Sequence, residues 1–171
     1  MLKILMKRKL MIMIAGFMLL GTIASYAQDA QLKPYNPQAN AKDDLAKAIA
    51  KADSSGKNVL LQIGGNWCKW CLRFTKFCSD THEIDTLISN NYVFYHLNYS
   101  KENKNLDILK TLDYPQRFGF PVLVVLNRKG VRIHTQDSGF LELNDGYSKD
   151  KIIEFLSNWT PKTLDPKNFE K

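Results

Sequence analysis

The sequence predicts an α/β fold in which a central sheet of parallel and antiparallel strands is flanked by helices. From residue 43 to about residue 112, segments with helical spacing of apolar residues alternate with short apolar strands. This order calls for parallel strands joined by crossovers. A later strand is followed by a turn at residues 127–130 and a further strand, which predicts an antiparallel hairpin. The length of 171 residues and the hydrophobic content of 44% fit one folded domain.

The first 27 residues are typical of a secretory signal peptide. An apolar run over residues 10–20 follows four basic residues, and Ser25-Tyr26-Ala27 offers small residues for cleavage before Gln28. We therefore expect an exported, periplasmic protein. An uncleaved membrane anchor is the alternative, but the run is shorter than the ~20 residues that a span prefers. No cysteine lies near residue 28, which argues against a lipoprotein anchor.

The basic character of the whole chain comes largely from this leader. The formal net charge is +7, but without residues 1–27 there are 20 Lys and Arg against 17 Asp and Glu, a balance of +3. Basic residues do not cluster with aromatic ones in any segment, so we expect no nucleic-acid partner.

The mature chain starts with a polar lead-in, residues 28–42, which contains Pro34 and Pro37. We expect the folded domain at residues 43–160. Its first helix is indicated by apolar residues at helical spacing between Leu45 and Ala52, and Gly56 is its stop signal. Residues 59–63 are nearly all apolar, which is typical of a central strand covered on both faces.

A helix from residue 68 to residue 78 follows, with Cys71, Phe74 and Cys78 on one face by their spacing. Residues 80–83 have the spacing of a capping box and predict a second short helix behind it. Aromatic residues at 92–99 indicate the next strand. Residues 100–105 are a charged loop, and leucines between 106 and 112 mark another helix.

The last elements are a buried strand that begins at Pro121, the turn at 127–130, and an alternating strand at 131–135. Residues 137–147 are expected to form a loop. Ser148 is the expected N-cap of a final helix whose apolar residues lie between Ile152 and Trp159. Pro161 and Pro166 mark a polar tail, residues 161–171.

The most informative stretch is Trp67-Cys68-Lys69-Trp70-Cys71, which lies between the first strand and the following helix. A cysteine in the first turn of a helix faces unpaired N–H groups and the positive end of the helix dipole, which favour the thiolate. Such positions lower a cysteine pKa from about 8.5 to between about 3.5 and 7.5, and the charge of Lys69 acts in the same direction. We expect Cys68 to be the exposed nucleophile, with Cys71 one turn deeper to close an intramolecular disulfide.

This motif, followed some fifty residues later by Phe120-Pro121 at the start of an apolar strand and then a hairpin, resembles the thioredoxin superfamily. The resemblance covers residues 43–159, and within it the chain is similar to exported bacterial thioredoxin-like proteins with a Trp-Cys-x-Trp-Cys motif. It implies a mixed four-stranded sheet flanked by helices, Cys68 as the attacking thiol and Cys71 as the resolving thiol. It also implies that Pro121 is a cis-proline beside the disulfide and that the Phe120 backbone pairs with an extended substrate.

Two positions depart from thioredoxin itself. Gln62 stands where thioredoxin has a buried Asp that helps to deprotonate the resolving thiol, and Gln cannot act as a base. We therefore expect mixed disulfides to resolve more slowly, with the help of water or of a carboxylate that the sequence does not identify. The Lys69-Trp70 dipeptide differs from the dipeptides of the reducing, oxidising and isomerising relatives, so the potential is placed only within about −270 to −120 mV.

Several alternatives stay open beside this interpretation. Cys68, Cys71, Cys78 and His82 have residue types that bind zinc, although Cys78 is expected to point inward on the same helix and to act as a small buried hydrophobe. His82, His96 and His134 gain no partner from their spacing and are interpreted as surface or strand residues. Trp67, Trp70, Phe118 and Phe120 would form an apolar surface around the disulfide. At least one of Trp67 and Phe118 is expected to lie in the core instead.

The sequence thus predicts a monomeric periplasmic thiol-disulfide oxidoreductase that acts on protein cysteines without a cofactor and works as a reductase. Reduction in an oxidising compartment implies a membrane electron donor. The predicted substrate contacts are Trp67, Lys69, Trp70, Phe120 and Pro121. The rival functions are a non-catalytic binding or chaperone-like module and a zinc-stabilised domain.

Overall fold

The computed structural model describes residues 32–170, so the predicted signal peptide lies outside the described residues. The elements that build the domain follow one another in the order α2 (Ala41–Ser55), β1 (Asn58–Gly64), α3 (Lys69–Asp80), α4 (His82–Asn91), β2 (Tyr92–Asn98), α5 (Leu106–Thr111), β3 (Val122–Leu126), β4 (Arg132–Asp137) and α6 (Lys149–Asn158). A short 3-10 helix at Pro115–Phe118 precedes β3. The predicted order of helices and strands is confirmed.

The sheet has the strand order β2-β1-β3-β4. β1 pairs in parallel with β2, and Leu61 lies opposite Tyr95. β3 is antiparallel to both of its neighbours, so β3 and β4 form the predicted hairpin. The predicted mixed four-stranded sheet is therefore correct, with β1 and β3 at its centre.

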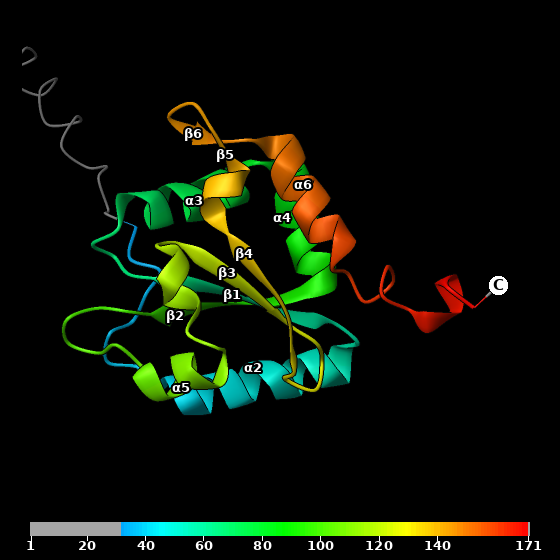
Figure 1. Cartoon of the computed structure of the whole chain (residues 1–171), viewed down its shortest axis with the longest axis horizontal. Coiled ribbons are helices and arrows are strands. Elements are labelled where there is room, and N and C mark those ends of the chain that lie inside the picture. Colours follow the sequence, from blue (N-terminus) through cyan, green and yellow to red (C-terminus); the bar gives the residue numbers. More distant parts are fainter. Residues whose placement is uncertain (1–31, 171) are drawn as a thin grey trace, which may run out of the picture. The chain divides into compact units, whose positions relative to one another are not determined.

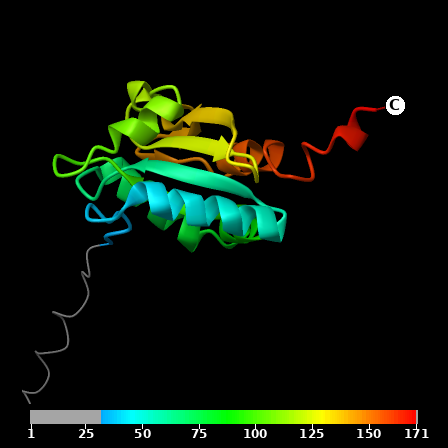
Figure 2. The same ribbon diagram turned by 90° about the horizontal axis from the view of Figure 1, so that it is seen from below.

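Helices cover both faces of this sheet (Figure 1). Leu60 on β1 and Leu123 on β3 point toward α3, α4 and α6. Their neighbours Leu61 and Val124 point toward α2 and α5, and α2 lies over the sheet in the view from below (Figure 2). Alternate residues of β1 therefore belong to different cores, and Gln62 falls on the same side as Leu60, which places it under α3.

Two local details differ from the sequence prediction. The segment expected to be a loop at 137–147 contains a 3-10 turn, Ser138–Leu141, and a small hairpin of β5 (Glu142–Leu143) and β6 (Gly146–Tyr147). The predicted capping box does not form, because Asp80 ends α3 and Thr81 caps α4 without a side-chain hydrogen bond. Ser148 caps α6 as expected and accepts from the Lys151 amide.

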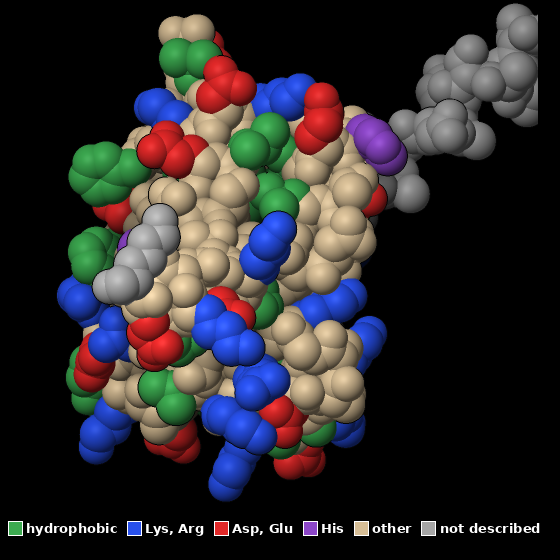
Figure 3. Space-filling view, turned by 90° about the vertical axis from the view of Figure 1, so that its right-hand side faces the viewer, with side chains coloured by type: hydrophobic (Ala, Val, Ile, Leu, Met, Phe, Trp, Pro, Cys, Tyr) green, Lys and Arg blue, Asp and Glu red, His purple; other side chains and the backbone are tan. Residues whose placement is uncertain are grey.

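Acidic and basic side chains lie among one another on the face shown in Figure 3. Among the described residues, Lys149 pairs with Glu83 at 2.6 Å and Lys129 pairs with Asp53 at 2.9 Å. Within residues 32–170, no helix is long and apolar enough to cross a bilayer.

Candidate active site

Cys68 and Cys71 form a disulfide at the start of α3, with their Cα atoms 5.2 Å apart. Cys68 is the N-cap of this helix, and the Cys71 amide donates to its Sγ atom at 3.1 Å. A sulfur at an N-cap thus takes the place of the side-chain oxygen that usually accepts from this turn. The predicted arrangement, with one sulfur at the helix tip and the other one turn deeper, is the one observed.

The pair is more enclosed than expected. Cys68 is only 7% exposed, and Cys71 is fully buried. The expectation of an exposed Cys68 was therefore wrong in degree, because Tyr35 packs against both cysteines and the rings of Trp70 and Phe120 lie against the same cluster. A narrow approach to one sulfur favours attack at Cys68 over attack at Cys71.

The loop before β3 faces the disulfide across this approach. The Phe120-Pro121 peptide bond is cis, as the resemblance implied, and Pro121 is buried. Cys68 Sγ lies 3.6 Å from the Phe120 carbonyl oxygen. Within the described chain, neither the amide nor the carbonyl of Phe120 takes part in a backbone hydrogen bond. These two groups are thus free to pair with an extended segment next to Cys68.

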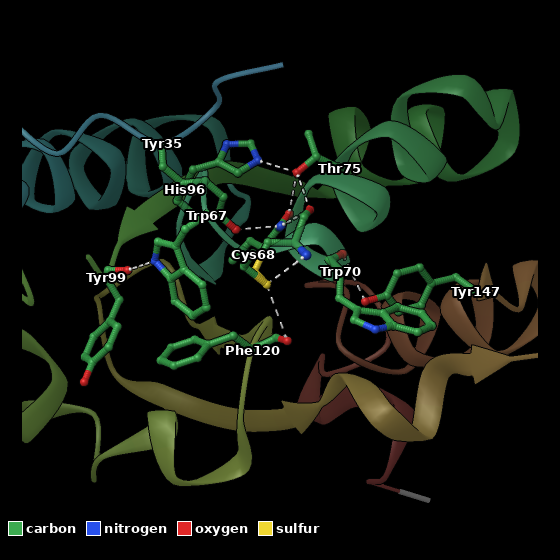
Figure 4. Close-up of a disulfide and its surroundings, with 11 residues drawn as sticks. Tyr35, Trp67, Cys68, Trp70, Thr75, His96, Tyr99, Phe120 and Tyr147 are labelled. Carbon is green, nitrogen blue, oxygen red and sulfur yellow. Dashed lines mark hydrogen bonds between the residues drawn. A yellow bond between two sulfur atoms is a disulfide. The ribbon is translucent and has the colours of Figure 1, made fainter. Parts of the chain in front are cut away.

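Aromatic side chains surround the approach to Cys68 (Figure 4). The Trp67 ring is 57% exposed and packs edge-on against Phe120 at 5.5 Å. Its Nε1 atom donates to the Tyr99 carbonyl at 2.7 Å, which fixes the orientation of the indole. Trp70 lies on the other side of the disulfide, edge-on to Tyr147 at 5.5 Å.

Two predicted aromatic positions need correction. Trp67 and Phe118 are 57% and 41% exposed, so neither lies in the core. Phe118 contacts the guanidinium of Arg117, whose Cζ is 4.4 Å from the ring centroid, and it is not part of the cluster around the disulfide. Lys69 is exposed at the first position of α3. The apolar surface around the disulfide is therefore built from Trp67, Trp70 and Phe120.

A buried polar network lies beneath Cys71 and was not predicted. Gln62 Nε2 donates to the Tyr35 hydroxyl at 2.7 Å and to the Cys71 carbonyl oxygen at 2.9 Å. The carbonyl can only accept, so the amide group of Gln62 is oriented with its nitrogen toward it. Gln62 Oε1 therefore faces the Thr75 hydroxyl, which lies 3.1 Å away. The departure from thioredoxin at residue 62 replaces a buried acid with a neutral hydrogen-bonding group.

His96 on β2 extends this network. Its Nε2 atom is 3.1 Å from Thr75 Oγ1, and its ring is edge-on to Tyr35 at 5.2 Å. Burial lowers the pKa of His96 to about 4, so the ring is neutral at pH 7. The sequence interpretation gave His96 no partner, because its contacts come from elements distant in the chain. The network thus carries no formal charge at neutral pH.

Tyr35, like Thr75, is a residue of this site that the sequence analysis missed altogether. It lies in the segment expected to be a polar lead-in, yet only 2% of its surface is exposed. Its backbone is held by Asn66, which accepts from the Tyr35 amide at 3.2 Å and donates to the Tyr35 carbonyl at 2.7 Å. A single aromatic residue flanked by Pro34 and Pro37 was the one available signal.

The four residues of the zinc alternative do not come together. Cys78 is buried among Phe74 and other core residues of α3, α4 and α6, on the sheet side of its helix. Burial raises the pKa of the Cys78 thiol, which keeps it neutral. Among residues 32–170, no group of three or more His, Cys, Asp or Glu side chains converges on a common point. The interpretation of Cys78 as a small buried hydrophobe agrees with its position.

A groove of about 580 Å³ opens next to Trp67. Trp67 and Tyr99 form an apolar wall of this groove, and the charged loop with Lys101, Glu102 and Lys104 forms another. Its lining residues are Pro37, Asn66, Trp67, Asn98, Tyr99, Ser100, Lys101, Glu102 and Lys104. The groove therefore continues the apolar surface away from the disulfide.

Comparisons with known proteins agree with this geometry. The chain is 25% identical over 100 residues to the thiol:disulfide interchange protein DsbD of Vibrio cholerae serotype O1. That alignment covers 57% of this chain but only 16% of the relative, so the chain spans a small part of that protein. A crystal structure of a disulphide isomerase from Xylella fastidiosa Temecula1 superposes with a TM-score of 0.67 and 26% identity. The superposition covers 75% of this chain and 98% of the Xylella chain.

Residues 40–128 match the family described as thioredoxin-like. This range is just over half of the 171 residues, and it contains both the Cys68–Cys71 pair and the loop that faces it. The chain belongs to the thioredoxin-like family.

Proposed function

We propose that this protein is a periplasmic thiol-disulfide oxidoreductase that exchanges disulfides with the cysteines of other proteins. The observation that carries the proposal is the position of Cys68, at the N-cap of α3 and 3.6 Å from the Phe120 carbonyl oxygen, which has no backbone partner among the described residues. The helix stabilises a thiolate at this sulfur, and the loop can hold a substrate chain against it. The similarity to proteins named for disulfide interchange and isomerisation supports the same chemistry.

The first step begins with reduced protein. The Cys68 thiolate attacks one sulfur of a substrate disulfide, and the other substrate sulfur leaves as a thiolate and takes a proton from water. A mixed disulfide between Cys68 and the substrate results. The Cys71 amide, which donates to Cys68 Sγ at 3.1 Å, lowers the energy of the attacking anion.

The second step releases the substrate. Cys71 loses its proton and attacks Cys68 Sγ, the mixed disulfide breaks, and the second substrate sulfur leaves as a thiolate. Two electrons have then passed to the substrate, and the Cys68–Cys71 disulfide has formed. The reverse sequence oxidises a dithiol substrate by the same steps.

Substrate binding is assigned to the surface around Cys68. The free amide and carbonyl of Phe120 would pair with an extended chain, with Pro121 holding the loop in place. Trp67 and Trp70 would cover the apolar side chains of that chain on either side of the disulfide, and the exposed Lys69 would lie at its edge. Main-chain pairing favours any unfolded or extended segment over a particular sequence.

We propose that the reaction runs in the reducing direction in a protein exported by cleavage after Ala27. Disulfides accumulate in the periplasm, so a reductase there needs electrons from a membrane thiol donor. We also propose that the protein acts as a monomer and without nucleic acid, since each step uses sulfur atoms of one chain and its substrate.

The proposal is tested by following the reduction of a model protein disulfide, with dithiothreitol as electron donor, by the purified protein. Cys68→Ser is expected to abolish the catalysed rate. Cys71→Ser is expected to accumulate a mixed disulfide that can be isolated on a non-reducing gel. Cys78→Ala is the matched control, because this third cysteine is buried away from the pair, and its rate should equal that of the unchanged protein.

The binding-module alternative predicts a different pattern. The exposed Trp67 ring and the neighbouring groove could hold an unfolded chain without any exchange. In that case Cys68→Ser would still suppress aggregation of an unfolded client as well as the unchanged protein does, and the catalysed rate would be absent throughout. Such a result would overturn the oxidoreductase proposal.

Direction and location have separate measurements. Equilibration with glutathione gives the Cys68–Cys71 potential, and a value near −270 mV supports reduction whereas a value near −120 mV contradicts it. Cell fractionation and N-terminal sequencing would place the protein, with Gln28 expected as its first residue. Recovery in the cytoplasm with an intact N-terminus would rule out the periplasmic assignment.

A further inference from the structure

We propose that the Tyr35 hydroxyl donates a hydrogen bond to the Cys71 sulfur when that sulfur becomes a thiolate, and so promotes the step that resolves the mixed disulfide. The inference rests on the proposed function, because it concerns the second of its two steps. It assigns a role to a residue outside the Trp-Cys-x-Trp-Cys motif, in the segment that precedes the first helix.

Tyr35 and Cys71 meet beside Gly64, the last residue of β1. A methyl group placed on the Gly64 Cα would overlap Cys71 Sγ and would lie 3.1 Å from the Tyr35 hydroxyl oxygen. Both atoms thus flank the same small space, which only a glycine leaves open. Tyr35, Cys68 and Cys71 form one buried cluster, and Figure 4 shows Tyr35 reaching toward the disulfide from the side opposite Phe120.

The hydrogen bonds of Gln62 leave the hydroxyl proton of Tyr35 available. Gln62 Nε2 donates one proton to the Cys71 carbonyl and the other to the Tyr35 oxygen. Within residues 32–170 this is the one hydrogen bond of the Tyr35 hydroxyl, and it uses an oxygen lone pair. Cys71 Sγ borders the same space beside Gly64, and it is the acceptor that we assign to that proton.

A buried thiolate needs such a donor here. Cys71 is fully buried, so its ionisation is opposed by loss of water. The neighbouring groups are neutral, since residue 62 is an amide and His96 is uncharged at pH 7. Burial also raises the pKa of Tyr35, so this side chain stays protonated and acts as a donor and not as a base. A charge-assisted hydrogen bond is the remaining way to stabilise the anion.

The donor is held in place before the reaction. The two hydrogen bonds between Asn66 and the Tyr35 backbone join this segment to the turn that carries Cys68. The edge-on contact with the His96 ring also restrains the Tyr35 ring. Little reorganisation is then needed when the charge forms on Cys71.

Tyr35→Phe removes the hydroxyl and keeps the ring. In a Cys68→Ala/Cys78→Ala background, only Cys71 is left to titrate as a thiol, and Tyr35→Phe is expected to raise its pKa by about one unit. With both motif cysteines present, the mixed disulfide should then persist about tenfold longer at pH 7. The rate at which Cys68 first attacks a disulfide should change less than this lifetime, because Tyr35→Phe keeps the ring that packs against Cys68 and removes only the hydroxyl beside Cys71.

Tyr92→Phe is the matched control. Tyr92 is also a buried tyrosine, and its hydroxyl donates to the Leu156 carbonyl at 2.5 Å, away from the disulfide. It is expected to lose stability without changing the Cys71 pKa. An unchanged Cys71 pKa in Tyr35→Phe, or equal shifts in the two variants, would overturn the inference.

A measurement on the unchanged protein decides the matter if Tyr35→Phe does not fold. The NMR resonance of the buried Tyr35 hydroxyl proton should shift downfield as Cys71 ionises. A chemical shift that stays constant through this titration would contradict the proposal. Failure of the oxidoreductase function shows instead as the absence of any mixed disulfide at Cys68. The Cys71 titration still answers the question in that case.

Discussion

The side-chain nitrogen of Gln62 donates a hydrogen bond to the main-chain carbonyl oxygen of Cys71 at 2.9 Å. A neutral amide therefore lies beneath the deeper cysteine, at the position where thioredoxin has a carboxylic acid. This contact stabilises the turn of α3 that carries Cys71, but it offers no group that could take the proton of the thiol.

Replacing Gln62 by Asp should shorten the lifetime of the mixed disulfide, because a buried carboxylate can accept the Cys71 proton. Gln62→Asn is the control, since it has the same length and no basic group. Both variants should lose about 1–3 kcal/mol of stability through the broken contacts to Tyr35 and Cys71. Lifetimes are measured by quenching the reaction with acid, and equal values for Asp and Asn would contradict the prediction.

Phe120→Ala should lower kcat/KM for protein disulfides about tenfold, because it removes the ring that packs on Trp67 and Tyr99. This change corresponds to a loss of about 1.5 kcal/mol of transition-state stabilisation. The reaction with glutathione disulfide should change little, because the Phe120 carbonyl and the two cysteines remain. Phe118→Ala is the control, as this ring contacts Arg117 and not the disulfide cluster. A similar loss in both variants would show that the Phe120 ring has no special role.

The low pKa of His96 predicts a pH-dependent stability. Its pKa is about 4 in the folded protein and 6.5 ordinarily, so the unfolded chain binds the proton more tightly. The contribution of the neutral ring is fully present above pH 6.5 and is lost as the pH falls toward 4. After allowance for partial exposure, this loss is on the order of 2 kcal/mol.

Urea unfolding between pH 7 and pH 4 measures this effect. His96→Gln cannot titrate, so its stability should fall less steeply than that of the unchanged protein over this range. The difference between the two curves removes the contribution of carboxylates that titrate in both. Parallel curves would mean that His96 is not held neutral by its surroundings.

Gly64→Ala should destabilise the oxidised protein by about 1–3 kcal/mol, because the added methyl overlaps Cys71 Sγ and crowds the Tyr35 hydroxyl. Both neighbours are held by the disulfide and by Gln62, so neither can move aside freely. Gly146→Ala is the control, since its nearest neighbouring atom, the Leu143 carbonyl oxygen, is 3.9 Å away. Chemical denaturation of both variants checks the prediction, and equal stabilities would refute it.

Much of the fold follows from local patterns. The apolar run at residues 59–63, the Trp-Cys-x-Trp-Cys motif behind it and the hairpin after Pro121 are contiguous signals, and each forms where it was expected. Burial of single aromatic residues was less predictable. Trp67 is exposed and Tyr35 is buried, because their environments depend on how distant segments pack.

The polar network could not be inferred from spacing. Tyr35 lies 27 residues from Gln62, and Thr75 lies 21 residues from His96, yet both pairs share hydrogen bonds. Such contacts exist only once β1 and β2 are paired and α3 is packed on them. The sequence showed that Gln62 replaces the acid of thioredoxin, but it did not show which residues Gln62 contacts.

The order of elements and the place of Cys68 at the tip of a helix were determined by the sequence alone, since hydrophobic periodicity and helix signals act over a few neighbouring residues. The tertiary structure decided which groups surround the deeper sulfur. Burial and long-range packing brought Tyr35, Gln62 and His96 beneath Cys71. The chemistry available to that cysteine is set by contacts between segments that are far apart in the chain.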